Sequence, residues 1–131
     1  MSYHVNLTAA ANINEFFRQV LNTGAKSQLV VMSIPPGGDI GAEVHAHVEQ
    51  TLVIVSGEGE SIVDGVKQPM VTGDVLVVTP GANHNIVNTG QVPLKLYTVY
   101  APANHIDGRV HKTQAEAIAD TEDEAFGETV Q

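Results

Sequence analysis

The chain contains no cysteine and no tryptophan, and only 6 of its 131 residues are lysine or arginine. The absence of cysteine excludes disulfides and thiolate metal sites. The few basic residues are not clustered, which argues against a nucleic-acid partner. No apolar run reaches the roughly 18 residues of a membrane-spanning helix, and the first residues lack the basic and apolar regions of a signal peptide. We therefore expect a cytoplasmic protein without a membrane partner.

The negative charge is concentrated near the C-terminus. The formal net charge is −9, and residues 114–131 contain no basic residue but six acidic ones: Glu116, Asp120, Glu122, Asp123, Glu124 and Glu128. Thr113 is a suitable N-cap, and Glu116 stands three residues later in the capping-box position. We therefore expect a short helix followed by a solvated acidic end.

Between residues 16 and 101, short apolar segments alternate with turn signals. FFRQVL and QLVVMSI flank NTGAKS, which predicts a hairpin. TLVIVSG and GESIV predict a second hairpin around Gly57 and Gly59. Asp64-Gly65 predicts a two-residue turn into VKQPMV, where Pro69 indicates an edge strand or bulge. Without long helices between these segments, the pattern predicts an all-β sandwich or barrel. Residues 8–15 are compatible with one helical turn.

Two histidines, His45 and His47, directly precede the most apolar segment. In a strand, residues two apart face the same side, so both imidazoles can reach one metal ion. His84 follows a second apolar segment closed by a Pro-Gly turn. If both segments close one barrel, the three imidazoles can converge inside it. The alternative is that His45 and His47 are half-exposed polar residues at a strand end.

These residues occur in a pattern that resembles the two motifs of the cupins, which are small double-stranded β-helix (jelly-roll) barrels. The matching positions are Gly41, His45, His47 and Gly57 in the first motif, and Gly73, Gly81, His84 and Asn88 in the second. The resemblance covers residues 28–101 and is strongest to small single-domain cupins often described as similar to mannose-6-phosphate isomerase. It implies a single barrel domain over residues 1–112, followed by a short helix and acidic tail over 113–131.

The resemblance also implies a divalent metal ion, although Gln50 stands where the family has a glutamate ligand. Strand alternation places Gln50 on one face and Glu49 on the other. Gln50 is therefore the inward residue, and Glu49 can replace it only if the turn is bulged. The implied ligands are His45, His47, Gln50 and His84. Such ligands suit Zn, Mn, Fe, Ni, Co or Cu alike, and a neutral ligand set favours anionic substrates.

The sequence leaves the catalytic groups open. Glu43 shares strand parity with His45 and is a candidate general base, and Glu49 is a second candidate. His105 and His111 follow the last strand and can pack at the barrel mouth, contact a second subunit or contribute to a site.

Two classes of function follow. The first is a metal-dependent enzyme that acts on a small molecule in the barrel, either as an isomerase of sugars or other hydroxycarbonyl compounds or as a dioxygenase. The alternative is a non-catalytic module that binds a small molecule or a metal. We also expect a homodimer, because small barrels of this type leave an apolar sheet edge for a partner to cover.

Overall fold

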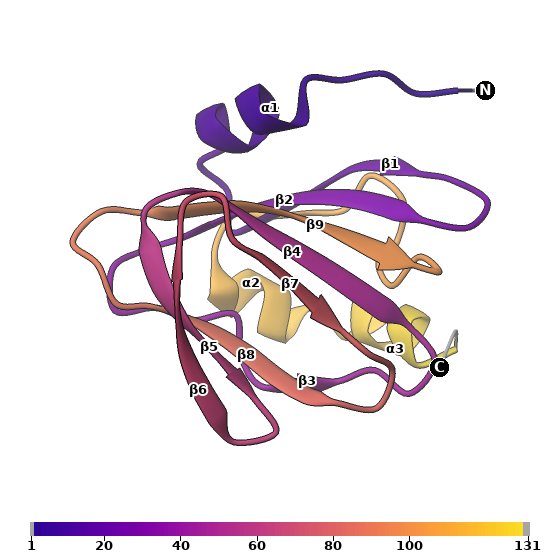
Figure 1. Cartoon of the computed structure of the whole chain (residues 1–131). Coiled ribbons are helices and arrows are strands. Elements are labelled where there is room, and N and C mark those ends of the chain that lie inside the picture. Colours follow the sequence, from indigo (N-terminus) through magenta and orange to yellow (C-terminus); the bar gives the residue numbers. More distant parts are fainter. Residues whose placement is uncertain (1, 130–131) are drawn as a thin grey trace.

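The computed structural model describes residues 2–129 and contains two antiparallel sheets with three short helices (Figure 1). The strands are β1 (Arg18–Thr23), β2 (Gln28–Ile34), β3 (Glu43–Val44), β4 (Glu49–Ser56), β5 (Glu58–Val63), β6 (Val66–Val71), β7 (Val75–Val78), β8 (Asn83–Asn88), β9 (Leu94–Ala101) and β10 (Val110–His111). One sheet has the order β10-β1-β2-β9-β4-β7 and the other the order β3-β8-β5-β6. The helices are α1 (Leu7–Ile13), α2 (Gln114–Ala119) and α3 (Thr121–Thr129).

The core lies between the two sheets and follows the alternation of the strands. In β4, the side chains of Gln50, Leu52 and Ile54 are buried, whereas the residues between them are more exposed. In β9, every second residue from Leu94 to Tyr100 is fully buried. Alternate residues point to opposite faces of a strand, so each strand supplies one apolar face to the core. The all-β double-stranded β-helix that the sequence predicts is confirmed.

Two of the predicted turns are confirmed, and the prediction of a hairpin around Gly57 and Gly59 is wrong. β1 pairs with β2 across the predicted turn, and Asp64-Gly65 joins β5 to β6. Pro69 lies on β6, an edge strand, as its missing N–H requires. However, β4 and β5 do not pair, because they belong to different sheets. Gly57 has a φ of 92°, which glycine adopts readily, and here the chain crosses from one sheet to the other.

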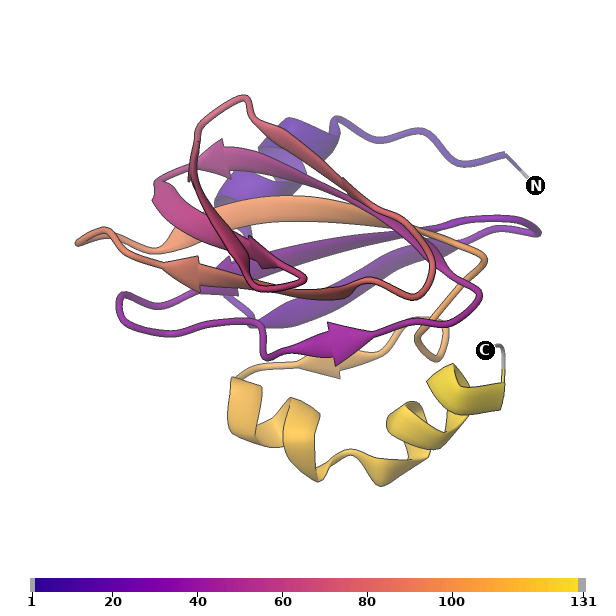
Figure 2. The ribbon, with the colours of Figure 1, turned by 60° about the horizontal axis from the view of Figure 1, so that its bottom comes forward.

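The C-terminal segment begins as predicted but does not continue as a solvated end. The Thr113 side chain accepts a hydrogen bond from the backbone N–H of Glu116 at 3.2 Å, so the predicted cap of α2 is confirmed. The chain then forms α3, where Asp123 and Gly127 are buried. Figure 2 shows both helices outside the sheets, on the side where β3 lies. The division of the chain at residue 112 into two units stays a prediction.

The N-terminal helix covers the outer face of the six-stranded sheet. The side chain of Asn6 caps α1 by accepting from the N–H of Ala9 at 3.0 Å. The helix contacts β2, β4 and β9, and Figure 1 shows it above these strands. Within residues 2–129, no helix has both the length and the apolar content needed to cross a membrane.

Candidate metal centre

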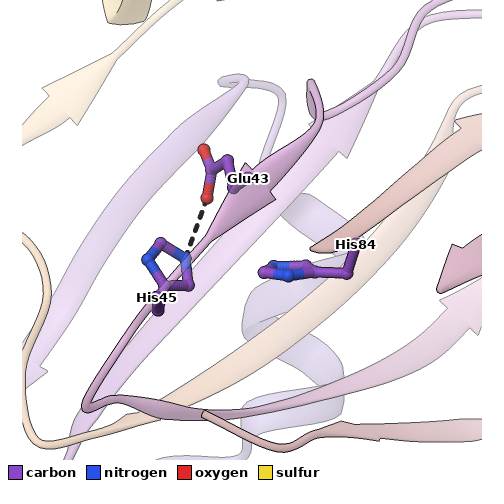
Figure 3. A group of neighbouring side chains, drawn as sticks. All are labelled: Glu43, His45 and His84. Carbon is purple, nitrogen blue, oxygen red and sulfur yellow. Dashed lines mark ion pairs between the residues drawn. The ribbon is translucent and has the colours of Figure 1, made fainter. Parts of the chain in front are cut away.

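Glu43, His45 and His84 converge at one end of the four-stranded sheet (Figure 3). The pairing of β3 with β8 sets Glu43 directly opposite His84, and residues opposite each other in an antiparallel pair have neighbouring side chains. Each of the three side chains offers one ligand atom, and these atoms lie within 4.8 Å of one another. Nε2 of His45 lies 3.0 Å from Oε2 of Glu43. This arrangement can hold a metal ion.

His84 is oriented in the way that metal-binding histidines usually are. Its Nδ1 lies 3.2 Å from the carbonyl oxygen of Ala82. A carbonyl oxygen only accepts hydrogen bonds, so this contact favours the tautomer with the proton on Nδ1, in which Nε2 of the neutral ring keeps its lone pair. Burial lowers the pKa of His84 despite this hydrogen bond, so the ring is neutral at neutral pH. In this tautomer a lone pair on Nε2 is available to a cation.

Gln50 lies beside His84, on the inward face that strand alternation predicts. The side chain is buried, its Oε1 is 2.9 Å from Nε2 of His84, and its Nε2 donates to Oγ1 of Thr98 at 3.1 Å. In this orientation of the amide, and with the proton of His84 on Nδ1, Oε1 of Gln50 and Nε2 of His84 are two acceptor atoms that face each other. Two ligands bound at about 2.1 Å and at right angles on one ion are about 3 Å apart. The spacing of Gln50 and His84 thus fits two neighbouring ligands of one metal ion.

The structure does not bring His47 or Glu49 into this group. The expectation for His47 assumed an extended strand, but β3 ends at Val44 and residues 46 and 47 form a bend. His45 is therefore buried while His47 is exposed. Glu49 is also exposed at the start of β4, as the alternation with Gln50 requires. His47 is replaced in the candidate site by Glu43, and Glu49 faces away from it.

Glu43 gives the candidate site a negative charge, where the sequence predicts a neutral three-histidine site. Burial by itself would raise the pKa of Glu43, but the hydrogen bond with His45 and the positive charge of Arg18 together hold that pKa below its usual value. The carboxylate is therefore ionised at neutral pH. With a carboxylate present, the preference for anionic substrates no longer follows from the ligand set alone.

A cavity of about 470 Å³ adjoins this group. Glu43 and His45 line it from the barrel, together with Arg18 of β1 and His105 of the segment after β9. Residues of α2 and α3 line its other side, among them Gln114, Ala117, Asp123 and Glu124. Two of the candidate metal ligands, Glu43 and His45, thus border a space large enough for a small molecule.

Comparison with known proteins agrees with this architecture. The family model for the cupin domain matches residues 30–100. The chain belongs to the cupin family. This cupin is 44% identical to the uncharacterized protein YrkC of Bacillus subtilis (strain 168) over 88% of the chain, and it spans only 65% of that relative's length.

Two further similarities extend over most of the chain. An uncharacterized protein of Acanthamoeba polyphaga mimivirus is 33% identical over 82% of this cupin and 70% of its own length. A crystal structure of a Bacillus halodurans protein shares 36% identity with a TM-score of 0.89, covering 91% of this chain and 95% of that one. The last similarity includes segments outside residues 30–100, so the fold of most of the chain has a counterpart among solved structures.

His105, whose role the sequence leaves open, is fixed by Asp123 of α3. Its Nδ1 lies 2.7 Å from Oδ2 of Asp123, whose Oδ1 accepts from the N–H of Ile106 at 2.7 Å. Gln28 accepts from the N–H of His105 at 3.0 Å. Burial lowers the pKa of His105, although Asp123 opposes this effect, and the same contact keeps the pKa of Asp123 low despite its burial. The pair is therefore a neutral imidazole oriented by a carboxylate.

Sequence reasoning missed two residues at this cavity, Asp123 and Arg18. Asp123 is one of several acidic residues in the C-terminal segment, and nothing in the sequence separates it from its neighbours. Arg18 is different, because it shares an inward strand parity with the buried Val20. An arginine on the apolar face of a predicted strand was a usable signal for a buried functional cation.

We expect Asp123→Ala to destabilise the protein by about 2–3 kcal/mol, because it leaves His105 Nδ1 and the N–H of Ile106 without their acceptor. The measurement is urea-induced unfolding. The control is Glu122→Ala, which removes from the same helix an exposed carboxylate that pairs with Arg109. It should lower the stability much less, because exposed ion pairs contribute little. Equal effects of the two substitutions would contradict the anchoring role of Asp123.

Proposed function

We propose that this cupin binds a divalent metal ion through Glu43, His45, Gln50 and His84 and acts on a small molecule in the adjoining cavity. The observation that supports this most strongly is the convergence of three ligand atoms, from Glu43, His45 and His84, within 4.8 Å of one another. Two of these residues, Glu43 and His45, line the cavity. The donor set of two imidazoles, one carboxylate and one amide suits Zn, Mn, Fe, Ni, Co or Cu. A bound ion would supply a Lewis acid that polarises an oxygen of the ligand.

Of the two enzyme classes, the isomerase-like one receives more support from the cavity. An isomerase of hydroxycarbonyl compounds needs a group that moves a proton between neighbouring carbons. His105 lines the same cavity as Glu43, and Asp123 holds its Nδ1. Because a neutral imidazole with a protonated Nδ1 can accept a proton at Nε2, His105 is a candidate base in addition to Glu43. A dioxygenase needs no such base.

The non-catalytic binding module is the second candidate. Two features of the sequence favour it, namely the absence of the family's glutamate at position 50 and the lack of an evident base. Glu43 now supplies a carboxylate, and the His105–Asp123 pair supplies a candidate base, so both reasons are weaker. Catalytic turnover separates this module from an enzyme, because both would bind metal and ligand.

We expect purified protein to bind close to one equivalent of a first-row divalent metal. His45→Ala and His84→Ala should each weaken metal affinity by about 100-fold, since each removes one ligand, whereas His47→Ala should leave it unchanged. Metal analysis and competition titration with a chelator measure these affinities, and circular dichroism checks that each variant is folded. A loss of metal in His47→Ala equal to that in His45→Ala would contradict the proposed ligand set.

Metal-loaded protein distinguishes the two enzyme classes directly. We expect it to exchange a carbon-bound hydrogen of small hydroxycarbonyl compounds with deuterium from the solvent, because isomerisation passes the proton through an exchangeable base. His105→Gln should reduce this exchange by about 100-fold or more while metal binding persists. Deuterium incorporation is followed by NMR, and dioxygen uptake is recorded on the same compounds. Uptake of dioxygen without exchange would replace the isomerase-like assignment by the dioxygenase-like one.

We also propose a homodimer in the cytoplasm. Support for the dimer comes from Val75 and Val77, which are 58% and 53% exposed on β7, an edge strand of the six-stranded sheet. Exposed apolar residues on an edge strand favour pairing with another copy. Sedimentation should show a dimer that Val77→Lys converts to a monomer. The control Val66→Lys, at an exposed position of β6, should leave the dimer intact. A monomeric wild-type protein would contradict this proposal.

A further inference from the structure

Arg18 is a buried cation in the wall of the cavity. The residue is 5% exposed, although it lies on β1 next to the space between the barrel and the C-terminal helices. A guanidinium group stays protonated at every pH that a protein tolerates and carries five N–H donors. Buried arginines are therefore rare unless other groups neutralise the charge and accept these hydrogen bonds.

Within residues 2–129, Arg18 lies over the ring of Phe17, with its guanidinium carbon 5.2 Å from the ring centroid, and interacts with the side chain of Tyr100. Its contacts with groups that could neutralise the charge are long. Nη2 of Arg18 lies 3.9 Å from Oε1 of Glu43, and Nη1 lies 3.5 Å from Nδ1 of His111. Nε is buried and has no hydrogen-bond partner among residues 2–129. Glu43 is also in contact with His45 at 3.0 Å, so its negative charge is shared. The cost of burying Arg18 is thus not offset by close pairing within the protein.

The surroundings of Arg18 favour a ligand with a single negative charge. The flat guanidinium fork matches a carboxylate, which can accept two parallel hydrogen bonds. Two acidic side chains, Glu43 and Asp123, line the same cavity, and they would repel a phosphate dianion about twice as strongly as a carboxylate. Glu124 and Glu128 also line the cavity but are exposed, so solvent screens their charges.

The position of Arg18 also links it to the candidate metal centre. Its nearest carboxylate, Glu43, belongs to the group formed with His45 and His84. A molecule of a few carbon atoms in the cavity can therefore approach Arg18 at one end and this group at the other. We propose that Arg18 binds the carboxylate of a small organic acid whose oxygen-bearing end reaches the Glu43–His45–His84 group. The assignment of that second end rests on the proposed function, whereas the role of Arg18 does not.

The test compares lactate with lactamide, which has nearly the same size and keeps the hydroxyl but lacks the charge. Affinities are measured by calorimetry or ligand-detected NMR, with zinc-loaded and with metal-free protein. We expect the wild type to prefer lactate by about tenfold or more, because a charge-assisted hydrogen-bond pair is lost with the amide. Arg18→Met should abolish this preference, Arg18→Lys should keep part of it, and Lys67→Met should leave it intact, because Lys67 is exposed on β6.

The proposed metal site and the proposed role of Arg18 are overturned by different outcomes. Failure to bind zinc refutes the metal site, but the metal-free measurements still test Arg18. Equal binding of lactate and lactamide by the wild type, or an undiminished preference in Arg18→Met, overturns the role of Arg18. Tighter binding of inorganic phosphate than of lactate overturns the carboxylate assignment. If Arg18→Met does not fold, Arg18→Lys decides, since full wild-type preference there would show that the guanidinium fork is not used.

Discussion

The antiparallel pairing of β3 with β8 is the constraint on which the candidate site depends. β3 is only two residues long, yet its register sets Glu43 opposite His84 and leaves His45 to follow at the strand end. A shift of the β3–β8 pairing register by one residue would turn each of these side chains to the opposite face of the sheet. The chain reinforces this register nearby, because Asn85 accepts from the N–H of Gly41 at 2.9 Å and donates to Asp39 at 3.0 Å.

The C-terminal helices complete the cavity, and charged contacts tie them to the barrel. A line of polar contacts runs from Glu43 through Arg18 to His111, and His111 Nε2 lies 2.8 Å from Asp120 between α2 and α3. A second contact joins His105 to Asp123 at 2.7 Å. The acidic C-terminal segment therefore has a structural role. It lines one side of the cavity and orients the imidazole of His105 there. The contacts that hold α2 and α3 against the barrel thus also shape the site.

Much of the fold could be predicted because it follows local rules. Alternating apolar residues in β4 and β9 specify which face is buried, and Asp64-Gly65 specifies a tight turn. The failed hairpin at Gly57 shows the limit of such rules. A glycine-containing turn between two strands is equally compatible with pairing the strands or with passing from one sheet to the other, and only the pairing of β4 with β9 and of β5 with β8 decides between them.

The sequence by itself determined most of the strands between residues 16 and 101, the inward side of Gln50 and the cap of α2. It also singled out His45 and His84, whose side chains the structure places close together. It could do so because these features depend on residues only a few positions apart, and on motifs with fixed spacing. The tertiary structure alone decided that Glu43 replaces His47 beside them, and that Arg18 and Asp123 face the cavity. Strand parity stops at the bend after β3, and contacts between segments as distant as residues 18, 43 and 123 depend on how sheets and helices pack.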